Sequence, residues 1–279
     1  MSRVIAICYD FDKTLSPTDM QAQGYIQSVG YDVEEFWKET NRIADANDMD
    51  TNLAYMYLMM INAEGNFVLT KDALEDYGSR VVLNPGVDTW FDRINAYGKS
   101  RGIEIEHYII SSGLKEMIDG TQIAKNGVFR KIYASSFYYD ENGRAVWPAQ
   151  AVNYTNKTQF LFRISKGCLD VNDKQVNEKF RADDMHVPFR NMVYIGDSET
   201  DIPCMKLINS YGGHSIGVYD GDEASERVKQ MMRDERIRYF APADYSEGKE
   251  LESILKLIID KTDAYERLEV IHEDNKKNA

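Results

Sequence analysis

The sequence predicts an α/β protein: a doubly wound parallel sheet of Rossmann type, with a small all-helical segment inserted after the first strand. Three short apolar runs, at 4–8, 107–110 and 192–195, each stop at a group of polar residues. Helical patterns follow these runs, as the crossovers of a parallel sheet require. Between the first two runs, residues 18–83 show helical spacing alone. These observations define the predicted architecture.

The first strand is the apolar run from Val4 to Cys8, which is typical of a strand buried on both faces. Asp10 and Asp12 follow it, and side chains two residues apart in an extended segment point to the same side. Both carboxylates are therefore expected at the carboxyl edge of the sheet, where open α/β sheets bind ligands. Two acids there repel each other unless a cation or a shared proton separates them. Mg²⁺ is the simplest such cation, because it takes one or two carboxylates together with a substrate phosphate.

The inserted segment 18–83 interrupts the alternation of strands and helices. Asp32–Glu35 resembles a capping box, and apolar residues follow it at helical spacing. The stretch Leu53–Ile61 is rich in Met and Tyr, and we interpret this face as the insert's own core rather than as the lining of a pocket. We therefore expect a small helical domain at 18–83, with 1–17 and 84–279 forming the α/β core.

The second run belongs to a strand near Glu104 to Ser111 and ends in Ser111-Ser112-Gly113. A helical pattern starts directly after it, and the free backbone N–H groups of a helix start suit an oxyanion or a phosphate. Farther on, residues 127–155 look β-rich, with a hairpin turn signal at 140–143.

The third run, Met192 to Ile195, repeats the architecture of the first. A glycine, Gly196, follows it, and then two acids, Asp197 and Asp201. In a parallel sheet the carboxyl ends of the strands share one edge, so these acids are expected near Asp10.

The rest of the chain completes the same pattern. Core strands are expected at 215–219 and 238–240, and a terminal helix at 251–259. Residues 269–279 are expected to fray. The polar and charged segment 165–190 is expected to be a surface excursion.

Composition narrows the possible partners. The net charge is −13 and the pI about 4.9, which argues against nucleic acid or an anionic membrane as the main partner. Cys8, Cys168 and Cys204 are odd in number and widely spaced, which indicates reduced thiols in a cytoplasmic protein. No apolar run of 18 residues and no leader-like apolar segment occurs, so we expect no membrane association. The sequence carries no indication of oligomeric state.

The polar strand ends resemble the motifs of the haloacid dehalogenase-like (HAD) superfamily, and the helical insert resembles the C1-type cap of its phosphoserine phosphatase-like subgroup. The matching positions, in chain order, are Asp10-x-Asp12-x-Thr14, Ser111, Lys157 and Gly196-Asp197-x-x-x-Asp201. They span most of the chain. One departure is Ser112-Gly113, which stands where two glycines often follow the serine.

The resemblance implies a role for each catalytic residue. Asp10 would be the nucleophile that forms an aspartyl-phosphate. Asp12 would protonate the leaving group and then deprotonate the attacking water. Thr14 would stabilise the turn that aims Asp12.

The resemblance also implies a metal site and a phosphate site. Mg²⁺ would be held by Asp10, the backbone carbonyl of Asp12, and Asp197, while Asp201 would orient the metal's water or Lys157. The substrate phosphate would be bound by the residues Ser111, Ser112 and Lys157.

The expected function is therefore Mg²⁺-dependent hydrolysis of a small phosphomonoester, with a small-molecule phosphate ester as the partner. Phosphomutases share the Asp-x-Asp pattern, so a mutase or another phosphotransferase stays an alternative. A catalytically idle binding protein on the same fold is a further alternative. Phosphonate cleavage would need a lysine from the insert, and nothing singles out Lys38 or Lys71.

Overall fold

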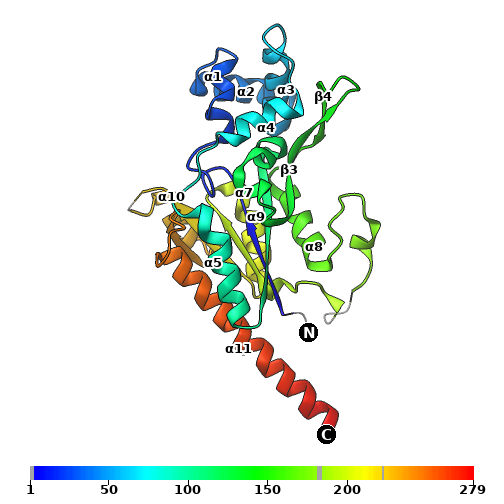
Figure 1. The fold of residues 1–279 in the computed structure, drawn as a ribbon, viewed down its shortest axis with the longest axis vertical. Helices are drawn as coiled ribbons and strands as arrows, with labels where there is room; N and C mark the ends of the chain where they lie inside the picture. Colours follow the sequence, from blue (N-terminus) through cyan, green and yellow to red (C-terminus); the bar gives the residue numbers. More distant parts are fainter. Residues whose placement is uncertain (1–2, 181–183, 222) are drawn as a thin grey trace.

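The computed structural model describes residues 3–180, 184–221 and 223–279. Residues 1–2, 181–183 and 222 lie outside the described residues; all of them belong to the predicted α/β core, and 181–183 also belong to the predicted excursion 165–190. Its centre is a seven-stranded sheet of order β4-β3-β2-β1-β5-β6-β7, parallel throughout except for β4 (Figure 1). The strands are β1 (Val4–Tyr9), β2 (Glu104–Leu114), β3 (Phe129–Tyr139), β4 (Ala145–Gln150), β5 (Met192–Gly196), β6 (His214–Tyr219) and β7 (Tyr239–Pro242). This sheet confirms the predicted fold class.

Helices cover both faces of the sheet (Figure 1). The α-helices are α1 (Tyr25–Ser28), α2 (Val33–Asn47), α3 (Thr51–Ala63), α4 (Lys71–Ser79), α5 (Val87–Ser100), α6 (Lys115–Gly120), α7 (Gln122–Lys125), α8 (Thr158–Lys166), α9 (Ile202–Ser210), α10 (Glu226–Arg233) and α11 (Glu250–Asn278). The short 3₁₀ helices are η1 (Met20–Ala22), η2 (Tyr154–Lys157), η3 (Lys174–Asn177), η5 (Phe189–Asn191) and η6 (Glu199–Asp201).

The apolar run of β1 is explained by burial on both faces. Ile5 and Ile7 belong to the core under α5 and α11, whereas Ala6 and Cys8 belong to the core under α8, α9 and α10. Successive side chains of a strand point to opposite faces, so a central strand between two helical layers needs apolar residues at every position.

The helices α1 to α4 lie beyond the carboxyl ends of the parallel strands (Figure 1). Helix α2 starts where Asp32 accepts hydrogen bonds from two backbone N–H groups, which satisfies donors that the first turn leaves free. In α3, Met56 and Met59 are buried in the core, as expected for the Met-rich face. Tyr55 differs, because it also lines a cavity described below.

The β3–β4 hairpin joins the α/β part of the chain to the helical insert. Its strands pair in the antiparallel sense around the turn at 140–143, as predicted. Near the tip, Arg144 forms a β-bridge with Thr70, and the N–H of Ala145 donates to the carbonyl of Leu69 (2.8 Å). The hairpin lies in the range 84–279, so this range contacts the insert through more than its chain connections.

The C-terminal segment differs from the prediction. Helix α11 continues to Asn278 and projects past the sheet (Figure 1), so the expected fraying of 269–279 is wrong. Arg267 pairs with Asp263 one turn earlier (3.6 Å), and Lys276 lies 3.9 Å from Glu273. Such pairs stabilise an exposed helix modestly, and basic residues suit its last turn.

Candidate active site

The three strands with polar ends are neighbours in the sheet, in the order β2-β1-β5. Tyr9, the last residue of β1, is level with Ile109 of β2 and Ile195 of β5. The next residue, Asp10, is anchored because its N–H donates to the carbonyl of Ile195 (2.9 Å). The topology therefore gathers all three polar ends at one edge, as the sequence predicted for an open α/β sheet.

A buried lysine contacts two of the acids. Lys157 Nζ lies 2.8 Å from Asp201 Oδ1 and 3.4 Å from Asp10 Oδ2, and the lysine side chain has no exposed surface. Burial alone would lower the pKa of Lys157, but the charges of Asp10 and Asp201 outweigh burial and raise it. Lys157 is therefore a fixed cation beside Asp10. Asp201 also accepts a hydrogen bond from the hydroxyl of Tyr194 (2.8 Å).

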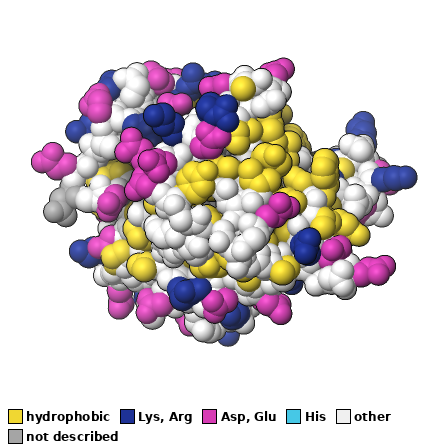
Figure 2. Space-filling view, turned by 90° about the horizontal axis from the view of Figure 1, so that it is seen from above, with side chains coloured by type: hydrophobic (Ala, Val, Ile, Leu, Met, Phe, Trp, Pro, Cys, Tyr) yellow, Lys and Arg dark blue, Asp and Glu magenta, His cyan; other side chains and the backbone are white. Residues whose placement is uncertain are grey.

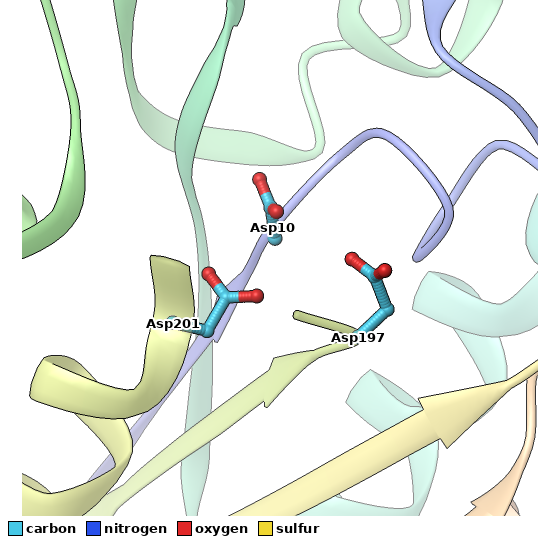
Figure 3. Close-up of side chains that lie close together, drawn as sticks. All are labelled: Asp10, Asp197 and Asp201. Carbon is cyan, nitrogen blue, oxygen red and sulfur yellow. The ribbon is translucent and has the colours of Figure 1, made fainter. Parts of the chain in front are cut away.

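Three buried carboxylates converge at this edge (Figure 3). One oxygen each of Asp10, Asp197 and Asp201 lies within 4.8 Å of the others. Burial and the charge of Asp201 raise the pKa of Asp10 to about 6 and that of Asp197 to about 7. Both shifts reflect several acids that are buried close together. Clustered carboxylate oxygens are what Mg²⁺ binds, so the residues fit a divalent cation.

The side chain of Asp12 contacts the helical insert. Its Oδ1 accepts a hydrogen bond from the N–H of Met20 (2.7 Å), at the start of η1. Burial, followed by the charges of Asp19 and Asp10, raises the pKa of Asp12 well above its ordinary value. A raised pKa favours the protonated carboxyl, which is the form that a proton donor needs.

The turn after Asp12 is held mainly by backbone groups. The N–H groups at positions 14, 15 and 16 donate to the carbonyl of Phe11 (2.9–3.2 Å). The carbonyl of Thr14 accepts from Asn84 Nδ2 (2.7 Å) and from the hydroxyl of Tyr245 (3.1 Å). The Thr14 hydroxyl is buried and has no hydrogen-bond partner among the described residues. Thr14 thus supports the turn through its carbonyl rather than its side chain.

The two serines are located in strand β2 and not at a helix start, because β2 continues to Leu114 and α6 begins at Lys115. Ser111 is fully buried, and its Oγ accepts a hydrogen bond from the N–H of Gly113 (3.0 Å). The hydroxyl of Ser112 is buried without a partner among the described residues. A Cβ on Gly113 would lie 2.8 Å from Asp12 Oδ2, so this position needs glycine for the close approach.

The chain matches a known protein family. Residues 7–206, which include the polar ends of β1, β2 and β5, match the family of haloacid dehalogenase-like hydrolases. The protein is a member of this family.

The chain is also similar to one sequence relative and to two solved structures. An uncharacterized protein of Borreliella burgdorferi is 27% identical over 276 residues, covering 89% of this chain and 94% of its own. A HAD-family hydrolase of Salmonella enterica serovar Typhi is 17% identical with a TM-score of 0.59, covering 86% of this chain and 67% of that one. A substrate-bound phosphoserine phosphatase complex is 15% identical with a TM-score of 0.55, covering 92% and 99%. At these identities the two solved structures support the HAD fold.

In this HAD hydrolase a cavity of about 250 Å³ lies between the sheet edge and the insert. Its floor contains the residues Asp10, Asp12, Ser111, Ser112 and Asp197. Sequence reasoning missed several other lining residues: Lys13, Asp19, Gln21, Trp37, Thr51, Asn52, Tyr55, Thr200 and Arg227. Asp19 and Gln21 closely follow the Asp12 turn, and this proximity is the one sequence signal that could have indicated them.

Arg227 is a missed residue that contacts one of the acids. It lies in the first turn of α10, and its guanidinium contacts Asp197 Oδ2 (3.0 Å). Arg227 therefore supplies positive charge to the carboxylate of the cluster that Lys157 does not contact. The two lysines of the insert that phosphonate cleavage would use, Lys38 and Lys71, do not line the cavity.

Proposed function

We propose that this HAD hydrolase is a Mg²⁺-dependent phosphatase that cleaves a small phosphomonoester through an aspartyl-phosphate on Asp10. The observation that carries the proposal is the position of Asp10. Its carboxylate lies on the floor of a cavity, 3.4 Å from a buried lysine, next to two more buried acids. Phosphoryl transfer depends mainly on positioning and charge neutralisation, which such a site provides.

The first step is attack of an Asp10 oxygen on phosphorus. A P–O bond to Asp10 forms while the ester P–O bond breaks. Asp12 gives its proton to the leaving alkoxide, and the surroundings that raise its pKa support this role. Lys157 neutralises charge on Asp10 and on the phosphate.

The second step returns the enzyme to its starting state. Asp12, now ionised, takes a proton from water, and the resulting hydroxide attacks phosphorus. The P–O bond to Asp10 breaks, and inorganic phosphate is released. Ser111 and Ser112 would hold phosphate oxygens through a hydroxyl and a backbone N–H.

Asp10, the Asp12 carbonyl and Asp197 would hold Mg²⁺, which would supply positive charge to offset the charge of the phosphate. Asp201 would keep Lys157 in place, in line with their 2.8 Å contact. Residues 18–83 would act as a cap that excludes bulk water during the first step and admits one water for the second.

The test is release of inorganic phosphate from p-nitrophenyl phosphate and from a panel of metabolite monoesters, with Mg²⁺ and with EDTA. We expect turnover with Mg²⁺ and its loss in EDTA. Asp10→Asn should lower turnover by at least about 1,000-fold, because an amide is a poor nucleophile.

The matched control is Asp48→Asn. Asp48 is exposed on the insert with φ of 48°, a conformation that asparagine tolerates, so activity should be retained. Retained turnover in a folded Asp10→Asn protein would overturn the role of Asp10. Transfer of the phosphate to a second hydroxyl group, rather than to water, would show a phosphomutase instead.

A further inference from the structure

Strand β2 is irregularly paired with β3 at the point where its polar residues begin. Ile110 is level with Tyr133, and the next paired residues are Leu114 and Ser135. Residues 111–113 of β2 therefore lie opposite a single residue of β3. Extra residues of this kind re-aim side chains and are frequent next to active sites. Their buried peptide groups still need hydrogen-bond partners, because such groups are rarely left unpaired.

The carbonyl of Ser112 is held by two side chains. It accepts a hydrogen bond from the hydroxyl of Ser135 in β3 (3.1 Å) and another from the hydroxyl of Tyr55 in α3 (2.9 Å). Ser135 is fully buried and lies outside the cavity lining. Its Oγ also accepts from the N–H of Val152 (3.1 Å), so the hydroxyl both donates and accepts. The orientation of the Ser135 hydroxyl is therefore fixed by two backbone groups.

The same peptide group connects Ser135 to Ser111. The carbonyl of Ser112 and the N–H of Gly113 belong to one planar unit, and this N–H donates to Ser111 Oγ (3.0 Å). A change in the orientation of the peptide group would therefore move the partner of the Ser111 hydroxyl. Since Ser111 Oγ accepts here, the hydroxyl can donate its own hydrogen to a phosphate oxygen at the cavity floor, which Ser111 lines.

Ser135 also contacts the segment that leads to Lys157. Val152, whose N–H Ser135 accepts, directly precedes Asn153. The N–H of Asn153 donates to Asn156 Oδ1 (2.7 Å), and the N–H of Asn156 donates to the carbonyl of Asn153 (3.0 Å). These bonds connect the segment to η2, which ends at Lys157. The Ser135 hydroxyl thus lies between the two segments that carry the phosphate-binding residues.

We propose that Ser135 is a positioning residue: its hydroxyl orients the peptide group between Ser112 and Gly113, and through it the Ser111 hydroxyl, for the phosphate in the transition state. This inference rests on the proposed phosphatase function and adds a residue that does not touch the substrate.

Steady-state kinetics with p-nitrophenyl phosphate test the inference. Ser135→Ala should lower kcat and kcat/KM together by about 10-fold and leave KM within about 3-fold, because a misplaced donor is lost mainly in the transition state. Orthovanadate, which adopts the five-coordinate geometry of that state, should inhibit the variant about 10-fold less tightly. Inhibition by inorganic phosphate should change less. Unchanged kcat and unchanged inhibition by orthovanadate would overturn the inference.

Ser215→Ala is the matched control. Ser215 is also fully buried, and its hydroxyl donates to Asn209 Oδ1 (3.0 Å) and accepts from the N–H of Arg238 (3.1 Å), away from the cavity lining. Both variants should lose a similar amount of Tm, because each loses the same kind of buried hydroxyl. The kinetics of Ser215→Ala should stay unchanged, and an equal loss of kcat in both variants would overturn a positioning role. Ser135→Cys, which keeps the size of the side chain but donates weakly, repeats the measurement should Ser135→Ala not fold.

A double variant shows whether Ser135 acts through Ser111. Ser111→Ala alone should lower kcat by about 100-fold. With Ser111 already removed, Ser135→Ala should lower kcat by no more than about 2-fold further, because the two residues act as a unit. Losses that multiply in full would overturn the inference and leave the phosphatase function standing. Failure of the unmodified protein to hydrolyse any ester would instead overturn the phosphatase function, and the inference with it.

Discussion

Below the nucleophile, a chain of buried hydrogen bonds holds the end of β1. The Trp90 indole donates to the hydroxyl of Tyr9 (2.9 Å), which lies 3.1 Å from His107 Nδ1. The other ring nitrogen of His107 lies 3.1 Å from Asn95 Oδ1. The hydroxyl of Tyr9 can donate to Nδ1, which leaves the proton of the neutral ring on the nitrogen facing Asn95. The chain thus positions the residue directly before Asp10.

The pH dependence of the free energy of unfolding tests this network, because it depends on the protonation of His107. Burial lowers the pKa of His107 from 6.5 to about 3, so the unfolded chain takes up a proton below pH 6.5 that the folded protein does not. Stability should therefore fall on acidification between pH 6.5 and 3, by up to about 1.4 kcal/mol per pH unit from this residue.

His107→Gln should flatten this pH dependence, measured by urea unfolding at a series of pH values. The exposed His272, replaced by glutamine, is the control and should leave the slope as it is. An equal slope in the His107 variant and the unmodified protein would show that the imidazole is not held neutral.

At the scale of single residues, the sequence predicted the site unevenly. Asp10 and Asp197 were predictable because each follows an apolar strand directly, and strand ends of a parallel sheet meet at one edge. Lys157 was suggested only by the order of motifs, since its burial depends on packing between η2 and α9. Trp37 and Arg227 could not be found, because they reach the cavity only once the chain is folded.

At the scale of elements, α11 shows how one helix can have two different parts. Up to Glu266 it is anchored: Glu266 is 1% exposed and lies 3.2 Å from both Arg190 and Asn191. Beyond Glu266, no residue of the helix is buried. The sequence predicted a helix at 251–259, because the apolar residues there recur at helical spacing, and made no prediction for 260–268. Residues 269–279 have no core-facing stripe, so the sequence predicted that they fray.

Truncation distinguishes the two parts. Removing the residues after Val270 should change Tm by no more than about 2 °C, because only exposed surface is lost. Removing those after Asp260 also deletes the buried Thr262 and Glu266, removes the contact between Glu266 and Asn191, and should lower Tm by at least about 4 °C. Equal Tm values for the two truncations would contradict this division.

The β3–β4 hairpin is an element whose role depended on tertiary contacts. Its strands and turn were predictable from β-rich sequence and the signal at 140–143. Its bridge from Arg144 to Thr70 was not, because the pairing joins residues 74 positions apart. The insert is consequently held by this bridge as well as by its two chain connections and its other contacts.

At the scale of the whole molecule, the acidic cluster predicts that a bound divalent cation stabilises the folded protein. A cation that binds only the folded protein stabilises it by about 2.7 kcal/mol at 100 times its dissociation constant. For a chain of this size, Mg²⁺ at that level should raise Tm by roughly 4–8 °C relative to EDTA.

Asp197→Asn should abolish this shift, while Asp48→Asn, on the exposed surface of the insert, should retain it. Thermal melting monitored by circular dichroism measures both. An unchanged shift in Asp197→Asn would place the metal elsewhere.

The surface of the molecule agrees with the composition. Figure 2 shows acidic and basic side chains interspersed around hydrophobic ones on the face seen from above. None of the described helices is long and apolar enough to cross a membrane. Both features follow from the sequence, since net charge and hydropathy need no tertiary structure, whereas the cavity between sheet and insert exists only in the folded chain.

The burial of all three cysteines has a practical consequence. Cys8, Cys168 and Cys204 are at most 5% exposed, and burial raises the pKa of each thiol. Thiol reagents attack the exposed thiolate, so the native protein should react slowly with maleimides. A cysteine placed at the exposed Lys38 would then take a fluorophore selectively, without prior removal of native thiols. Spectroscopy on that single label can follow the insert during turnover in an otherwise unmodified chain.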